Sequence, residues 1–297
     1  MNHIKDQIRC GAAYRLGLTG KGIGVAVLDT GIFLHRDFDS RVTGFADMVN
    51  RRNFAYDDCG HGTHICGIIG GSGRMSGGRY SGIAPGCDLV MVKVLDRKGN
   101  GYSSDVLAGI SWILERKEKL GIRILNISVG ACSKRGMSEN SALVKGVNRA
   151  WDAGLVVVVA AGNNGPRTMS ITTPGISRKV ITVGCSDDDR EVLVGGNRMV
   201  DYSGRGPTAA CICKPDLVAP GCSVVSCAGR ADKYTIKSGT SMSTPIVSGA
   251  TALLLERYPD MTNKDVKLKL RESCTDIGLP RNQQGWGLLD VEKLVSK

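Results

Sequence analysis

The sequence has no long apolar run and few large aromatic side chains. None of its hydrophobic stretches reaches the ~20 residues that a membrane-spanning helix needs, so we expect no membrane partner. Residues 1–6 lack the apolar core of a signal peptide. With only 4 phenylalanines but 40 glycines and 42% hydrophobic residues, this 297-residue chain is typical of a tightly turned α/β protein with a sizeable core.

Clustered charge of one sign is also missing, although the net charge is +11. The longest basic cluster, residues 116–119, has a glutamate within it, which is typical of a solvated helix face. A nucleic-acid-binding protein would need a basic patch on a known module, and the dispersed lysines and arginines provide neither. We therefore expect no nucleic-acid partner.

Paired cysteine motifs are scarce among the 11 cysteines. Cys211 and Cys213 are one residue apart, but no second Cys/His pair stands at the spacing of a zinc site. An odd number of scattered cysteines, without a signal peptide, indicates reduced thiols. We expect a cytoplasmic protein.

Short β-branched runs alternate with helical patterns along the whole chain. Strands are predicted over Ile23–Leu28, Leu89–Leu95, Ile122–Ile127, Leu155–Ala160 and Val180–Val183, and helices over Ser103–Leu120, Ser141–Ala153 and Met242–Glu256. Continuous apolar runs of this length suit strands that are covered on both faces. The alternation predicts an α/β fold with a mostly parallel sheet. Without a linker or repeat, we expect one domain over residues 1–297, with residues 1–20 as an extension before the first strand.

Four polar residues fall where an open parallel sheet gathers its functional groups, at the carboxyl ends of strands. Asp29 and Asn163 each follow an apolar run, whereas His61 and Ser241 stand just before one. Each has an ordinary explanation, because Asp and Asn favour turns and Ser caps helices. Together they give the order Asp, His, Ser, which is one of the orders known for the acyl-transfer triad. A zinc site at His61 and His64 is not favoured, because their spacing differs from the zincin motif.

The blocks around these residues resemble the signature blocks of the subtilisin-like serine proteases. They are Asp29–Gly31, Gly60–His64, Ala160–Asn163 and Gly239–Pro245, and the segments 203–208 and 214–221 are also similar to the family. The resemblance extends from about residue 11 to residue 289 and is strongest to intracellular bacterial members. It implies a three-layer α/β/α subtilisin-like fold with a mostly parallel central sheet.

The resemblance also implies a role for each of the four residues. Ser241 would be the nucleophile, and His61 the general base that takes its proton. Asp29 would hold the imidazole in the required tautomer. Asn163 would donate to the oxyanion together with the backbone N–H of Ser241.

Two further sites follow from the resemblance. Ser128, Val129 and Gly130 are similar to the family segment that pairs with substrate backbone as an added strand. Asp37 matches a position that often binds calcium, but the loop Gly70–Tyr80, which would supply partner ligands, has no carboxylate. We expect no cofactor for the chemistry and a structural calcium only as a candidate.

The expected function is therefore a serine endopeptidase that acts on polypeptides. The alternative is a catalytically silent subtilase-like binding or regulatory protein, but all four catalytic positions are filled. Ser243 and Ile246 replace an alanine and a histidine that are frequent in the family. The sequence leaves open the preferred residue before the cleaved bond, the physiological substrate, monomer or dimer, the control of activity, and whether a pro-segment was removed.

Overall fold

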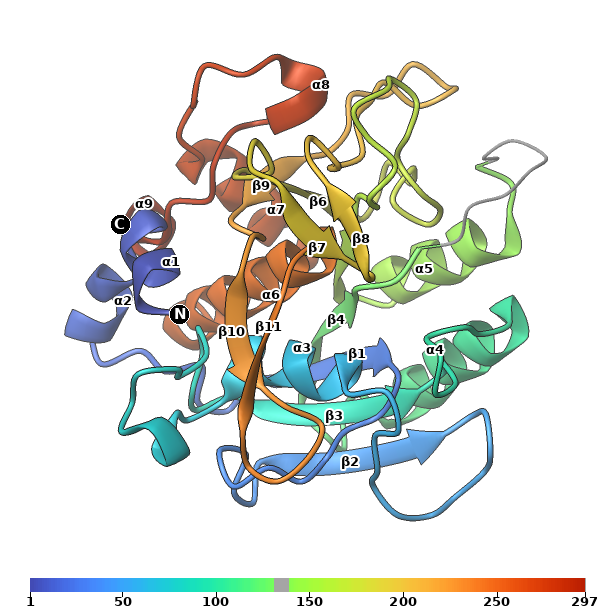
Figure 1. Cartoon of the computed structure of the whole chain (residues 1–297), viewed down its shortest axis with the longest axis vertical. Coiled ribbons are helices and arrows are strands. Elements are labelled where there is room, and N and C mark those ends of the chain that lie inside the picture. Colours follow the sequence, from blue (N-terminus) through green and yellow to red (C-terminus); the bar gives the residue numbers. More distant parts are fainter. Residues whose placement is uncertain (131–138, 297) are drawn as a thin grey trace.

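A parallel sheet of seven strands forms the centre of the molecule (Figure 1). The structure is a computed structural model that describes residues 1–130 and 139–296. The strand order is β2-β3-β1-β4-β5-β6-β9. The strands are β1 (Gly24–Asp29), β2 (Val42–Asp47), β3 (Asp88–Lys93), β4 (Ile122–Ile127), β5 (Val156–Ala160), β6 (Ile181–Cys185) and β9 (Leu217–Ala219).

The five predicted strands are confirmed to within two residues at either end. Every residue of β1, β5 and β6 is buried, as expected for strands covered by helices on both faces. The sequence did not reveal the edge strands β2 and β9. β2 is mostly half-buried and lacks a continuous apolar run, and β9 has only three residues.

Helices cover both faces of the sheet, so the predicted three-layer α/β/α arrangement is confirmed (Figure 1). α3 (His61–Gly70) packs on α6 (Thr240–Arg257) on one face. α4 (Ser103–Arg116) packs on α5 (Ala142–Asp152) on the other. α3 connects β2 to β3 and α4 connects β3 to β4, and both connections step in the same direction along the parallel sheet. Because the two helices lie on opposite faces, the two crossovers differ in hand, and one of them departs from the usual right-handed form.

The helices near the two ends of the chain lie side by side (Figure 1). α2 (Gly11–Arg15) contacts α9 (Val291–Val295), which also contacts α6 and α7 (Asn263–Ser273). Ile4, in α1 (Asn2–Gln7), is fully buried in the main core. The residues before β1 thus pack onto the body of the protein, and the division into a domain and an extension stays a prediction.

Two antiparallel hairpins and two short helices complete the described chain. β7 (Val192–Val194) pairs with β8 (Asn197–Met199), and β10 (Val224–Cys227) pairs with β11 (Tyr234–Lys237). The 3-10 helix η1 (Arg74–Ser76) and α8 (Arg281–Gln284) lie in loops. β10 contacts α3, so the second hairpin lies against the helix that carries His61.

The predicted functional residues come together at one edge of the sheet. Asp29 ends β1, Ser128 follows β4, and Asn163 lies three residues after β5. α3 and α6 begin at this same edge with His61 and Thr240. Within residues 1–130 and 139–296, no helix is long and apolar enough to cross a bilayer.

Candidate active site

Asp29 and His61 form a direct pair at the end of β1. The Asp29 carboxylate is fully buried and accepts a hydrogen bond from the backbone N–H of Thr30 at 2.7 Å. Nδ1 of His61 lies 2.8 and 2.9 Å from the two carboxylate oxygens. Because a carboxylate only accepts, Nδ1 carries the proton, and Nε2 is the nitrogen left for the cavity.

The environment of His61 favours the charged imidazolium. Burial lowers the His61 pKa, but the charge of Asp29 and its hydrogen bond outweigh this, and the net pKa is raised. Lys237 opposes the increase, since its ammonium group lowers the pKa of the imidazole. A base whose cation is stabilised in this way suits proton transfer near neutral pH.

Ser241 is the second residue of α6 and faces the same cavity as His61. The cavity has a volume of about 460 Å³ and is lined by His61, Ser128, Gly130, Asn163 and Ser241, among others. The Ser241 hydroxyl donates to the carbonyl oxygen of Ser128 at 2.7 Å. The position of Ser241 at the start of α6 places it close to backbone N–H groups that stabilise negative charge.

Asn163 is held by the first residue of α6. Its Oδ1 accepts hydrogen bonds from the backbone N–H and the hydroxyl of Thr240, both at 3.0 Å. The same hydroxyl accepts from the N–H of Gly162 at 3.2 Å. Because Oδ1 is occupied in this way, the NH₂ end of Asn163 is available to a ligand in the cavity that it lines.

Asp57 ties the loop before α3 to β1, a role that the sequence did not suggest. Its carboxylate accepts from the hydroxyls of Thr30 and Thr63 at 2.9 and 2.6 Å. It also accepts from the N–H of Gly60 at 2.7 Å. These bonds link the residue after Asp29 with the residues on both sides of His61.

Lys93 makes a second link between the same segments. Its ammonium group is fully buried and donates to the carbonyls of Thr30 and Leu95 and to Asp58, at 2.6, 2.8 and 2.7 Å. A lysine inside an apolar strand indicates an ammonium group that is paired with buried acceptors, because an unpaired buried charge is very costly. That signal was present in the sequence at the end of β3.

Thr172 narrows the cavity beside Ser241. Its side chain lies against the α-carbons of Gly130 and Gly162, so tightly that a β-carbon at either glycine would overlap it. Thr172 itself is buried, and its hydroxyl donates to the carbonyl of Ala161 at 3.2 Å. No sequence pattern marked Thr172, since only the fold brings it between the two glycines.

A second, more apolar cavity of about 230 Å³ continues from the segment Ser128–Gly130. It shares Val129 and Gly130 with the first cavity and is lined further by Tyr102, Val106 and Leu143. The predicted substrate segment therefore runs between two cavities. An extended chain laid along it would place alternate side chains in each.

His64, three residues after His61, faces away from the cavity. Its Nε2 contacts the carbonyls of Val224 and Thr235 at 3.1 and 3.2 Å, on β10 and β11. Burial, followed by the charges of Lys237 and His61, lowers the His64 pKa to about 3. His64 is thus neutral and holds the β10–β11 hairpin on α3.

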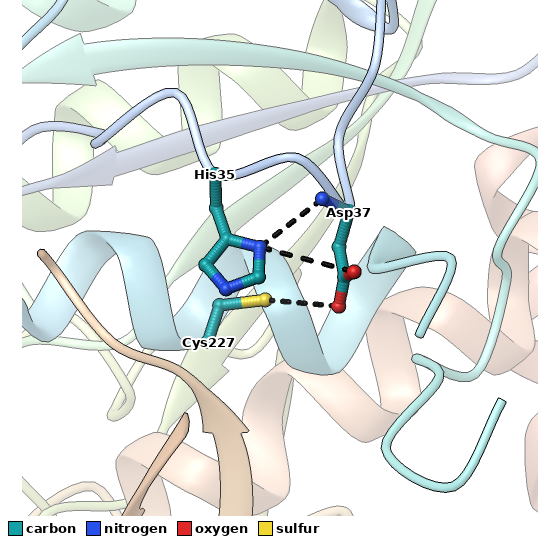
Figure 2. A group of neighbouring side chains, drawn as sticks. All are labelled: His35, Asp37 and Cys227. Atoms are coloured by element: carbon teal, nitrogen blue, oxygen red, sulfur yellow. Dashed lines mark hydrogen bonds and ion pairs between the residues drawn. The ribbon is translucent and has the colours of Figure 1, made fainter. Parts of the chain in front are cut away.

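Asp37 lies in a buried cluster that does not fit calcium (Figure 2). Its carboxylate accepts from the N–H of Met75 at 2.9 Å and the hydroxyl of Tyr234 at 2.7 Å, with the thiol of Cys227 at 3.7 Å. His35 Nδ1 lies 3.9 Å from Oδ1 of the same carboxylate. Calcium takes six to eight oxygen ligands, whereas Asp37 is surrounded by N–H, O–H and S–H donors.

The positively charged side chain of Arg41 holds together the loops next to Asp37. The Arg41 guanidinium donates to the carbonyls of Asp37 and Gly70, both at 2.6 Å, and of Cys87 at 3.1 Å. The backbone N–H of Ser72 donates to the Asp37 carbonyl at 2.9 Å. The loop Gly70–Tyr80 is thus attached to Arg41 and Asp37 through hydrogen bonds.

The ten cysteines that the structure describes are free thiols, and Cys132 lies outside the described residues. Cys59, Cys211 and Cys213 are exposed. Of these three, Cys59 lines the cavity with His61 and Ser241.

Comparison with known proteins places this geometry in a family. A sequence profile described as "Subtilase family" matches residues 20–287. The chain is 41% identical over 292 residues to "Serine protease AprX" of Bacillus subtilis (strain 168), covering 93% of this chain and 65% of that protein. It is 36% identical over 268 residues to "Thermostable alkaline protease" of Halalkalibacterium halodurans, covering 90% and 66% respectively. The chain thus spans slightly less than two thirds of the length of these two relatives.

A solved structure described as "Sphericase" superposes with a TM-score of 0.77. Its sequence is 31% identical, and the match covers 92% of this chain and 93% of that one.

Proposed function

Because the chain belongs to the subtilase family, we propose that it is a serine endopeptidase that hydrolyses peptide bonds through an acyl-enzyme intermediate. The observation that carries the proposal is that His61 and Ser241 line one cavity, while the buried Asp29 holds His61 from behind. These three residues come from β1, α3 and α6, which only the folded sheet brings together.

The nucleophile becomes active when its proton moves to His61. Ser241 Oγ attacks the carbonyl carbon of the substrate while His61 Nε2 accepts the hydroxyl proton. The imidazolium is stabilised by the Asp29 carboxylate, and it then returns the proton to the leaving amine. A water molecule then attacks the acyl-enzyme in the same way, with His61 as the base, and the free Ser241 hydroxyl is restored. In this structure the Ser241 hydroxyl donates to Ser128, so it must rotate towards His61 before attack.

The tetrahedral intermediate would be stabilised by two donors that are already in place. The NH₂ of Asn163 and the backbone N–H of Ser241 would both face the developing oxyanion. Thr240 fixes the Asn163 side chain through two hydrogen bonds, so little reorganisation is needed during the reaction. Such preorganised donors are worth most in sites from which water is excluded.

The substrate would bind as an extended strand along Ser128, Val129 and Gly130. Backbone pairing of this kind requires an unfolded or loop segment. The residue before the cleaved bond would enter the cavity next to Thr172, whose side chain would limit the size of that residue. A side chain further upstream would enter the apolar cavity that Val106 and Leu143 line.

The remaining properties are proposed on the same basis. Free thiols at all ten described cysteines support a reducing, cytoplasmic location. The proposed chemistry uses side chains alone, and residues 1–297 would act as one catalytic domain. A structural calcium would have to use oxygen ligands other than the Asp37 carboxylate, whose neighbours are hydrogen-bond donors. Polypeptides are the proposed partners.

The alternative, a silent binding protein, is tested directly. Wild type, Ser241→Ala and Ser243→Ala are incubated with unfolded casein, and each is treated with a fluorophosphonate that labels reactive serines. Ser243 is a matched control, since it is buried two residues further along the same helix. We expect cleavage and labelling in wild type and Ser243→Ala, and neither in Ser241→Ala. Absence of both in wild type would establish the silent alternative.

A further inference from the structure

The cavity that holds Ser241 continues into another one beyond Lys237. This adjoining cavity, also about 460 Å³, lies between the residues before α3 and the β10–β11 hairpin. Cys59 and Lys237 line both cavities. We call the adjoining space the hairpin cavity.

The hairpin cavity has an excess of unpaired positive charge. Arg230, Lys233 and Lys237 line it, and none of them has an ion-pair partner within the part of the chain that the structure describes. A concave surface with charges of one sign concentrates the electric field and attracts opposite charge.

The two carboxylates of the hairpin cavity are already committed to other partners. Asp57 accepts five hydrogen bonds from Thr30 and the residues around His61. Asp58 pairs with the buried ammonium of Lys93 at 2.7 Å. Neither forms an ion pair with Arg230, Lys233 or Lys237. Since Lys93 compensates Asp58, the three cations of the hairpin cavity outnumber the one remaining carboxylate, Asp57.

Lys237 lies close enough to His61, the proposed base, for its positive charge to affect the imidazole. The largest effects on the His61 pKa are burial, which lowers it, and the Asp29 carboxylate, which raises it. The ammonium group of Lys237 also lowers this pKa, by a smaller amount. A cation at this position opposes the imidazolium that the proposed reaction forms. An anion bound next to Lys237 would remove that opposition.

The positions of the cavities set the direction of a bound polypeptide. The apolar cavity shares Val129 and Gly130 with the central one, on the side where the acyl part of the substrate would pair. The hairpin cavity joins the central one through Cys59 and Lys237, next to His61. The leaving-amine part of the substrate would therefore pass into the hairpin cavity.

We propose that the hairpin cavity binds an acidic side chain of the substrate, on the leaving-amine side of the cleaved bond. The inference rests on the proposed function and adds to it a substrate class, namely polypeptides with Asp or Glu just after the cleavage point. Lys237 is the specificity-determining residue, with Arg230 and Lys233 adding to the field.

The test uses internally quenched peptides that differ at one position. Glu, Gln or Lys is placed at each of the first three positions after the cleaved bond, and the C-terminus is amidated so that it offers no carboxylate. We expect kcat/KM for the best Glu peptide to exceed that of its Gln counterpart by about fivefold at low salt. The preference should shrink as salt approaches 1 M.

Three variants distinguish the effect of Lys237 on substrate preference from the effect of the protein's overall charge. Lys237→Gln should bring the Glu/Gln ratio close to one, and Lys237→Glu should reverse the preference in favour of the Lys peptide. The matched control is Lys21→Gln, an exposed lysine just before β1 at the opposite edge of the sheet, and it should keep the wild-type ratio. Fluorophosphonate labelling of Ser241 checks that each variant is folded.

The outcomes are distinguishable. Equal cleavage of Glu and Gln peptides by a wild type that labels at Ser241 would overturn the inference and leave the proposed function intact. An unchanged preference in a labelled Lys237→Gln would overturn the assignment to Lys237. A wild type with neither cleavage nor labelling would overturn both proposals.

Discussion

Nδ1 of His61 lies between the two carboxylate oxygens of Asp29, at 2.8 and 2.9 Å. This contact fixes the tautomer and raises the His61 pKa against the effect of burial. Asp57 acts in the same direction as Asp29, and Lys237 acts against them. The Asp29–His61 pair therefore sets the pH range in which His61 is neutral and can act as a base.

The first prediction concerns the pH dependence of kcat/KM. His61 must be neutral to act as a base, so activity should fall as the pH drops through a value above the usual ~6.5 of histidine. Asp29→Asn should move this acid limb to lower pH and reduce kcat by about 10⁴. Asp152→Asn, at the end of α5 and paired with surface Lys179, should change neither. An acid limb that stays in place in Asp29→Asn would contradict the assignment.

Stability should show the opposite trend with pH at the same residue. The folded pKa of His61 is raised above the unfolded value, so the His61 contribution to the free energy of unfolding is complete below the unfolded pKa. It is lost as the pH rises through the folded pKa. Denaturant titrations of wild type and His61→Gln between about pH 5 and 9 measure this contribution. A difference that grows with pH would show that the sign is wrong.

The second prediction concerns the size of the residue before the cleaved bond. Thr172→Ala removes the atoms that lie against Gly130 and Gly162, so the cavity deepens. The ratio of kcat/KM for a Phe peptide over an Ala peptide should rise by about tenfold. Thr168→Ala, an exposed change in the same loop, serves as control. If Thr172→Ala leaves that ratio unchanged, Thr172 does not limit the cavity.

The third prediction concerns Arg41. Its guanidinium satisfies three carbonyls beside Asp37, and Arg41→Gln should lower the free energy of unfolding by about 2–4 kcal/mol. Arg36→Gln, which breaks the exposed pair with Asp232, should cost at most about 1 kcal/mol. Urea denaturation of the variants provides the comparison.

The same cluster predicts the response to chelators. Because hydrogen-bond donors surround the Asp37 carboxylate, EDTA should inactivate this protein less than it does calcium-dependent relatives. Thermal unfolding with and without EDTA is the measurement. Rapid unfolding in EDTA that only calcium reverses would mean that the loop Gly70–Tyr80 holds calcium after all.

The fourth prediction concerns the Cys59 thiol in the cavity wall. Cys59 is exposed as a residue, but neighbouring groups partly shield its thiol from water, and this desolvation raises the Cys59 pKa. N-ethylmaleimide should therefore react slowly at pH 7 and faster as the pH rises. Alkylation should block the passage between the two cavities that Cys59 lines and abolish peptide cleavage. Cys59→Ser should stay active after the treatment, although Cys211 and Cys213 remain exposed in it. Equal inactivation of wild type and Cys59→Ser would rule out this site.

The sequence predicted the elements and residues whose signals are local. Apolar runs marked the inner strands, and Asp29, His61, Asn163 and Ser241 were found because each stands next to such a run. The helix predicted from Met242 begins two residues earlier, at Thr240, because its first residues are polar and give no periodic signal. Ser241 therefore belongs to the first turn of α6.

Contacts between distant segments had no local signal. Thr172 lies against Gly130 and Gly162 only in the folded chain, and nothing near Lys237 in the sequence places it beside His61. The calcium expectation at Asp37 came from a resemblance at one position. The donors that fill its surroundings, Met75 and Tyr234, lie 38 and 197 residues away.

The burial of α6 has a consequence for the newly made chain. Every residue from Met242 to Leu255 is buried, and the helix contacts β1, β4, β5, β6 and β9. Asp29 and His61 leave the ribosome well before Ser241, and the helix that carries Ser241 can dock only once these strands are in place. A growing chain would thus have no nucleophile in position until α6 has been synthesised and has docked, so the proposed activity could not appear while only the segments that carry Asp29 and His61 have been made.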